Sequence, residues 1–115
     1  RQRLALARAL LFDTPIYIFD EATSNIDMES EEMIMNVIRE LSKTKMILFI
    51  SHRLSNVVDS DCIYMMKDGI VAEEGTHEQL MRKKGVYQRL FDKQKELESY
   101  AANMSWNDSL KKKVV

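Results

Sequence analysis

The sequence predicts an α/β fold with parallel strands, followed by a C-terminal β-hairpin and C-terminal helices. Short apolar runs at residues 16–19 and 46–50 are typical of buried strands, and helical patterns precede and separate them. Residues 62–66 and 70–74 flank a Lys-Asp-Gly turn at 67–69, which is a hairpin signal. The alternation of helix and strand favours parallel pairing of the first two strands.

The composition is that of an ordinary soluble globular chain of one domain or a piece of one. The chain has 115 residues, of which 45% are hydrophobic and 30% charged. Its 17 Lys and Arg nearly balance 18 Asp and Glu, for a net charge of −1, which excludes a nucleic-acid binder recognisable by charge alone. The single cysteine, Cys62, excludes an internal disulfide and a multi-cysteine zinc site.

Two helices are expected around the first strand. Residues 1–12 form the first, with Leu4, Ala7 and Leu11 on one face, and it ends before Pro15, which disfavours helical geometry in the preceding residue. The second runs from Asp27, a good N-cap, to about residue 41. Its expected apolar face consists of Met33, Ile34, Val37, Ile38 and Leu41.

The last part of the chain contains a helix signature and a polar tail. Thr76 and Gln79 have the spacing of a capping box, which predicts a helix over about residues 77–82. A further helix is expected over about residues 86–100. We predict one domain over residues 1–100 and a polar, mobile tail over residues 101–115.

Polar side chains follow the two strands of the expected parallel sheet. Asp20 and Glu21 come at the end of the first strand, and His52 follows the second. The carboxyl ends of parallel strands form the edge at which α/β proteins bind ligands. Carboxylates and an imidazole there suit acid–base chemistry or a metal–phosphate site. The alternative is solvated acids at a strand end and a histidine with a structural role.

Glycine is scarce, and the sequence lacks the familiar phosphate-binding loops. Three glycines are present, against about eight expected for this length. None is followed by lysine, so the pattern G-x-x-x-x-G-K-[ST] is absent, as is G-x-G-x-x-G. These absences and the initial Arg1 suggest a fragment or a processed product.

Several segments, in unbroken order over residues 1–100, resemble motifs of ATP-binding cassette (ABC) ATPases. Residues 16–24 (IYIFDEATS) resemble the Walker B motif, residues 24–27 (SNID) the D-loop and residues 49–55 (FISHRLS) the histidine switch. Residues 1–10 resemble the helix after the signature motif. The C-terminal pattern resembles that of exporter-type cassettes: Asp68-Gly69, Glu73, GTHEQL at 75–80 and GVY at 85–87.

The resemblance implies a partial P-loop NTPase core and assigns roles to five residues. Asp20 would help to hold Mg²⁺, through water, and Glu21 would polarise the attacking water. His52 would contact the γ-phosphate and hold Glu21 in place. Ser24 and Asp27 would belong to the loop that communicates across a dimer interface.

The resemblance further implies the C-terminal half of the nucleotide-binding domain of an ABC exporter. Its cofactors would be ATP and Mg²⁺, and its partners a second nucleotide-binding domain in a head-to-tail dimer and a transmembrane domain, with no nucleic acid. It would lie at the cytoplasmic face of the membrane through its parent protein. Because Walker A and the signature motif are missing from the sequence, we expect the 115-residue chain to be inactive alone.

Other functions are weighed against this one. A DNA-repair or chromosome-structuring ATPase shares these motifs, but that group usually has proline where Ala22 stands. Residues 20–23 (DEAT) also resemble helicase boxes, although the segment around His52 fits a helicase poorly. A non-catalytic truncated remnant is the third possibility. In each case we expect a marginal, association-prone chain, because a partial sheet leaves edges and apolar faces uncovered.

Overall fold

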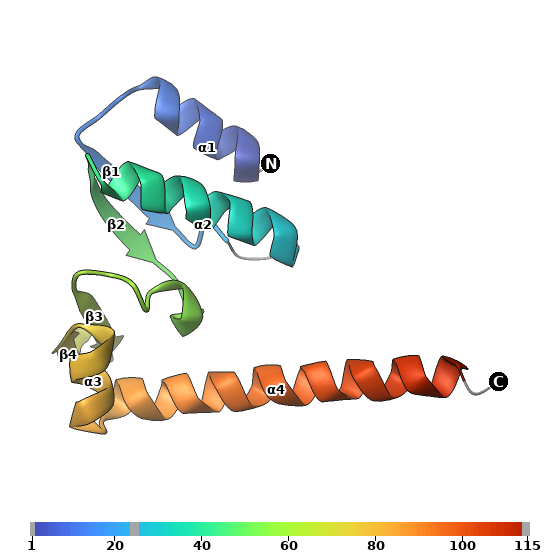
Figure 1. The fold of residues 1–115 in the computed structure, drawn as a ribbon. Coiled ribbons are helices and arrows are strands. Elements are labelled where there is room, and N and C mark those ends of the chain that lie inside the picture. The colour runs from blue at the N-terminus through green and yellow to red at the C-terminus, as the bar shows by residue number, and fades with distance from the viewer. Residues whose placement is uncertain (1, 24–25, 114–115) are drawn as a thin grey trace. The chain divides into compact units, whose positions relative to one another are not determined.

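The computed structural model describes residues 2–23 and 26–113, with side chains described for residues 4–23 and 26–105. The chain divides into two compact units, Arg1–His52 and Arg53–Val115, and each is described by itself. The elements follow in the order α1 (Gln2–Leu11), β1 (Ile16–Asp20), α2 (Met28–Ser42), β2 (Met46–Ile50), a 3₁₀ helix (Leu54–Asn56), β3 (Ile63–Lys67), β4 (Ile70–Gly75), α3 (His77–Lys83) and α4 (Val86–Lys113) (Figure 1).

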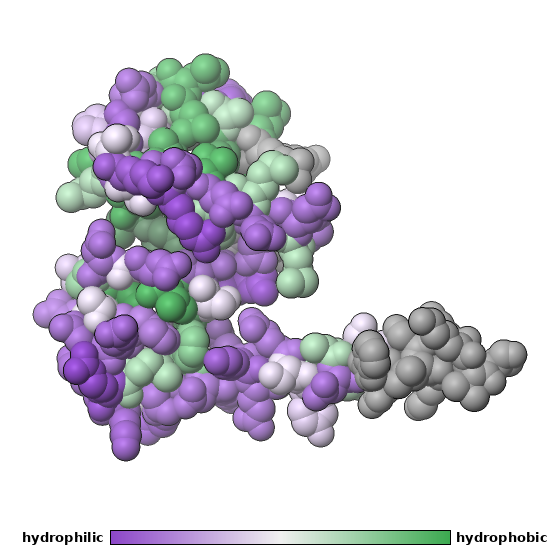
Figure 2. All heavy atoms as spheres, in the orientation of Figure 1, coloured by the Kyte–Doolittle hydropathy of each residue, from purple (hydrophilic) through white to green (hydrophobic). Residues whose placement is uncertain are grey.

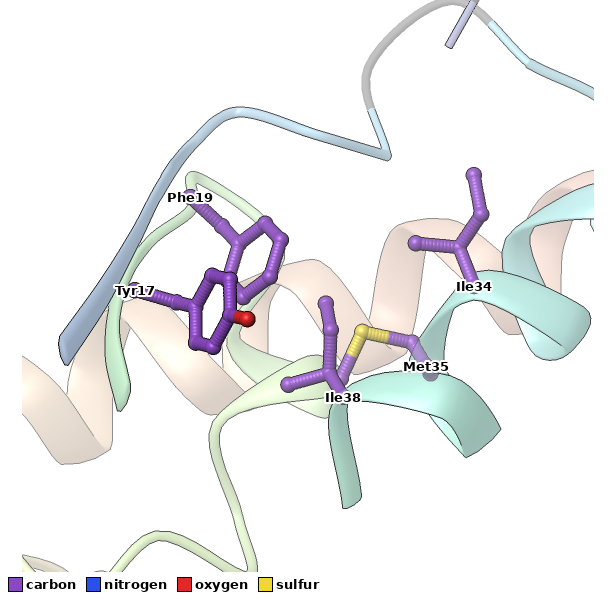
Figure 3. Packing of buried hydrophobic residues seen from close by; sticks show 5 residues of the cluster. All are labelled: Tyr17, Phe19, Ile34, Met35 and Ile38. Carbon is purple, nitrogen blue, oxygen red and sulfur yellow. The ribbon is translucent and has the colours of Figure 1, made fainter. Parts of the chain in front are cut away.

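The first unit is built on a two-stranded parallel sheet, as the sequence predicted. β1 and β2 pair in register from Ile16 opposite Met46 to Asp20 opposite Ile50. Helix α2 covers one face of this sheet. The core consists of Tyr17 and Phe19 from β1 packed with Ile34, Met35 and Ile38 from α2 (Figure 3).

The opposite face of the sheet is apolar but exposed. Ile18 is 65% exposed and Leu48, its register partner, is 50% exposed. Figure 2 draws the side of this unit that carries the helices, where green apolar residues lie among hydrophilic ones, and the second unit is mainly hydrophilic in the same view. The exposed apolar residues of the two strands are Ile16, Ile18, Met46, Leu48 and Ile50.

The helices of this unit turn slightly different faces inward than the sequence predicted. In α2, Met33 is 47% exposed and Met35 is buried beside Ile34 and Ile38. The buried positions 31, 34, 35 and 38 form one helical stripe, since residues three and four apart share a face. In α1, Leu6, Ala9 and Leu10 pack on the core, while Leu4 and Leu11 are exposed. The sequence of α1 has apolar residues on most sides and so marked no single face, whereas α2 buries Met35 in place of Met33.

The second unit combines the predicted hairpin with helices α3 and α4. β3 and β4 are antiparallel, with an irregularity between Met65 and Met66. The capping box predicted for α3 is present, since Thr76 accepts from the backbone of Gln79 and Gln79 accepts from the backbone of Thr76. The buried residues of this unit are Leu54, Val57, Ile63, Leu80 and Tyr87.

Helix α4 is longer than the sequence predicted. It was expected to end near residue 100 and instead continues to Lys113, through most of the expected tail. This segment contains strong helix formers, and its polar composition is typical of an exposed helix as well as of a mobile tail. The composition alone therefore did not distinguish the two. Cys62 is exposed. Among the described helices, none combines the length and the apolar character needed to cross a membrane.

Candidate functional site

The carboxyl ends of β1 and β2 bring the predicted site residues of the two strands to one edge of the sheet. Asp20 is the last residue of β1 and lies opposite Ile50, the last residue of β2. The pairing continues for one more residue, because the backbone N–H of Glu21 donates to the carbonyl oxygen of Ile50 at 2.8 Å. Glu21 and His52 therefore both leave the sheet at this edge.

Glu21 and His52 form an ion pair or a short hydrogen bond, according to the protonation of the imidazole. Nε2 of His52 lies 2.5 Å from Oε1 of Glu21. The Glu21 side chain is 35% exposed, whereas that of His52 is 90% exposed. The carboxylate thus anchors an imidazole that remains open to a ligand. The convergence of these two side chains was predicted from the order of the strands.

The backbone of Glu21 has a feature that the sequence did not reveal. Its φ is +51°, in the left-handed region that residues with a Cβ seldom adopt. Such conformations are costly and cluster at functional sites. The chain leaves β1 at this residue. In this conformation the backbone N–H of Glu21 bonds Ile50 and its side chain contacts His52. Neither glycine nor a turn motif marks the position in the sequence.

Asp20 is exposed at the same edge. It lines a small cavity of about 170 Å³ whose other walls include Leu6, Tyr17 and Ile34. In the described part of the chain, no three His, Cys, Asp or Glu side chains gather closely enough to hold a metal ion. Two adjacent carboxylates with water suit Mg²⁺, which keeps several waters and takes only one or two carboxylates from a protein. The exposed carboxylate of Asp20 is thus of the kind that could hold Mg²⁺ through water, and the other ligands would come from elsewhere.

The loop after Glu21 leads into the capped start of α2. Oδ2 of Asp27 accepts from the backbone N–H of Ser30 at 3.1 Å, as predicted for an N-cap. Ser24, the other predicted residue of this loop, lies outside the described residues. Thr23 and Glu31 are buried polar residues, at 3% and 7% exposure, which sequence reasoning did not single out.

One groove of the first unit is lined by residues other than those of this edge. It has a volume of about 650 Å³ and runs between α1 and α2, with Leu10, Met33 and Val37 in its wall. Neither Glu21 nor His52 lines it or the smaller cavity. Of the predicted residues at this edge, Asp20 lines the smaller cavity and His52 is largely exposed.

Comparison with known proteins gives the family. No family model matches the chain. An uncharacterized ABC transporter ATP-binding protein of Haemophilus influenzae is 56% identical over 97 residues, 84% of this chain. The ATP-dependent lipid A-core flippases of Salmonella typhimurium and Escherichia coli K12 are 51% and 50% identical over 90 residues, 78% of this chain. The chain is homologous to a segment of ABC transporter ATP-binding proteins.

A solved structure extends the likeness to the fold. A bacterial Atm1-family ABC exporter with ATP bound matches with a TM-score of 0.78 and 39% identity over 81% of this chain. The chain spans about 16 to 17% of the length of these ABC relatives. The α/β fold is thus that of part of an ABC ATPase, and the relatives do not favour the DNA-repair, helicase or non-catalytic alternatives.

Proposed function

We propose that this chain forms the C-terminal part of the nucleotide-binding domain of an ABC exporter and supplies the water-activating side of its ATP site. The observation that carries the proposal is the contact between Glu21 and His52 at the carboxyl edge of a parallel sheet. Homology to ATP-dependent exporters and a solved relative with ATP bound support it. The domain boundary near residue 100 belongs to the same proposal.

In this proposal Glu21 acts as the general base in ATP hydrolysis, and His52 positions its carboxylate. A carboxylate that accepts a proton from water needs a fixed orientation relative to the reacting phosphate. The contact of Glu21 with Nε2 of His52 fixes one carboxylate oxygen. The imidazole is 90% exposed, and in the proposal it would contact the γ-phosphate of ATP. Phosphoryl transfer depends on such positioning and on charge stabilisation.

Asp20 and Asp27 have supporting roles. Asp20 would hold Mg²⁺ through water, and this ion would neutralise phosphate charge when bound. Asp27 begins α2 and so ties the loop after Glu21 to a fixed helix. With Ser24, it would face the second nucleotide-binding domain across a head-to-tail dimer.

The rest of the ATP site must come from other parts of a longer protein. The sequence has no G-x-x-x-x-G-K-[ST] loop, so it lacks the backbone cradle and lysine that bind phosphates. The exposed apolar face of β1 and β2 is a surface that further strands or helices of a complete domain would cover. A transmembrane domain would place the assembly at the cytoplasmic face of a membrane.

The proposal is tested by a chimera of the Escherichia coli lipid A-core flippase. Its matching segment of 90 residues is replaced by the corresponding part of this chain. We expect the purified chimera to hydrolyse ATP and the 115-residue chain to show no turnover. A chimera that inserts into membranes and binds ATP without hydrolysing it would contradict the proposal, as would robust turnover by the chain alone.

A further inference from the structure

The C-terminal sequence pattern around Glu73, residues 75–80 and residues 85–87 has no part in the ATP chemistry described above. The structure brings its members together where β4, α3 and α4 meet. β4 ends at Gly75, α3 follows at once, and α4 starts at Val86. The contacts among Glu73, Gly85 and Tyr87 explain why these residue types occur together.

The side chain of Glu73 lies at the N-terminus of α4. Its Oε1 accepts from the backbone N–H of Tyr87, the second residue of the helix, at 3.1 Å. The first N–H groups of a helix have no partner within the helix, and a negative charge beside them is favourable. Tyr87 is fully buried, so water does not replace this acceptor. Glu73 thus performs the task of an N-cap side chain from a neighbouring strand.

Gly85 occupies the N-cap position and makes room for this carboxylate. Its carbonyl oxygen accepts from the N–H of Arg89, which marks the start of α4. A Cβ at position 85 would lie only 2.7 Å from Oε1 of Glu73 and also close to its other carboxylate atoms. Ordinary N-cap side chains are excluded by the same lack of space. The helix therefore begins with glycine because its cap comes from Glu73.

A second contact ties α3 to the same turn of α4. Nδ1 of His77 lies 2.9 Å from the hydroxyl of Tyr87, and its ring meets Phe91 edge-on with centroids 4.8 Å apart. His77 itself is half-buried. Tyr87 is thus held at its backbone by Glu73 and at its hydroxyl by His77.

We propose that Glu73 is the N-cap of α4 supplied by β4, and that Glu73 and Gly85 together form a lock that fixes the start of α4 against β4. Oε2 of Glu73 is buried and finds no hydrogen-bond partner among the described residues. A carboxylate enclosed in this way is held by packing against Gly85 as well as by Tyr87. The inference is independent of the catalytic roles proposed for Glu21 and His52.

The test is a double-mutant cycle on the full 115-residue chain, with Glu73→Ala, Gly85→Ala and the double variant. Loss of a cap makes unfolding about five- to tenfold more favourable. Gly85→Ala should strongly increase the equilibrium constant for unfolding when Glu73 is present. In the Glu73→Ala background, this increase should be at least about fivefold smaller. Urea unfolding measures these differences. Glu74→Ala, on the same strand with an exposed side chain, is the matched control and should show no coupling to position 85.

Amide hydrogen exchange supplies a local readout. Glu73→Ala should accelerate exchange of the Tyr87 N–H at least about tenfold more than that of Leu80, whose N–H donates to Thr76. Glu73→Gln keeps an acceptor oxygen and the shape, so it should fold and retain most protection at Tyr87. Additive effects of positions 73 and 85, or full loss of Tyr87 protection in Glu73→Gln, would overturn the proposal.

Discussion

Nε2 of His52 and Oε1 of Glu21 lie 2.5 Å apart, although the two residues belong to different strands. The contact exists because β1 and β2 are parallel and end in register, with Asp20 opposite Ile50. A shift of one residue in that pairing would move side chains to the opposite face. The chemistry of this edge thus depends on the register of two short strands.

Substitution of His52 by alanine should impair hydrolysis more than nucleotide binding. The variant leaves Glu21 without the contact that fixes Oε1, so the carboxylate loses its orientation. In the active flippase chimera we expect the rate of ATP hydrolysis to fall about 100-fold or more. Ser55→Ala, on the exposed side of the 3₁₀ helix, is the control and should retain activity. Near-normal turnover of the His52 variant would contradict the proposal that His52 positions the Glu21 carboxylate.

The ion pair between Asp13 and Lys45 should make the first unit sensitive to acid. Nζ of Lys45 lies 2.8 Å from Oδ1 of Asp13, and its hydrogen bond and charge hold the pKa of Asp13 below its ordinary value of 3.8. A carboxylate with a lowered pKa stabilises the fold above its unfolded pKa and loses this effect as the pH falls through the folded value. The pair is therefore complete at neutral pH.

Thermal unfolding of Asp13→Asn against the parent chain tests this ion pair. The variant should have the lower Tm at pH 7, and the difference should shrink as the pH falls below 3.8, the ordinary pKa of Asp13, and through its lower folded value. Lys45→Met should show the same pattern, since it removes the other partner. Added salt should shrink the difference, because both side chains can be reached by ions. A difference that is unchanged from neutral to acidic pH would contradict the assignment.

The exposed sheet face should make the isolated chain associate. Ile18 and Leu48 are register partners on this face, and each contributes about 1 kcal/mol of apolar burial when covered. Sedimentation velocity should show larger species as the concentration of the parent chain rises. The double variant Ile18→Thr/Leu48→Thr should shift this association to higher concentration and remain folded. A parent chain that stays monomeric throughout would contradict the expectation.

Short-range signals in the sequence predicted their structures well. Asp27 caps α2 and Thr76 caps α3, because each bond joins residues three positions apart. The parallel pairing of β1 with β2 followed from the order of strands and helices. The presence of Asp20, Glu21 and His52 at one edge followed in turn.

Features that depend on distant parts of the chain were not predictable. The left-handed φ of Glu21 occurs beside contacts with Ile50 and His52 that are distant in the sequence, and no glycine marks it. The burial of Met35 in place of Met33 depends on where the sheet meets α2. Glu73 and Tyr87 are 14 residues apart in the sequence, with α3 between them, so local sequence patterns contain no sign of this cap. The roles of Asp20, Ser24 and Asp27 toward a nucleotide stay predictions.

The most direct test of the account is nucleotide trapping by Glu21→Gln in the flippase chimera. Glutamine keeps the shape of the side chain but cannot accept a proton from water, so hydrolysis should fall at least about 100-fold while ATP stays bound. Glu29→Gln, an exposed acid in the first turn of α2, should hydrolyse ATP at the rate of the unsubstituted chimera. Unchanged turnover by Glu21→Gln in an active chimera would contradict the assignment of Glu21 as the general base.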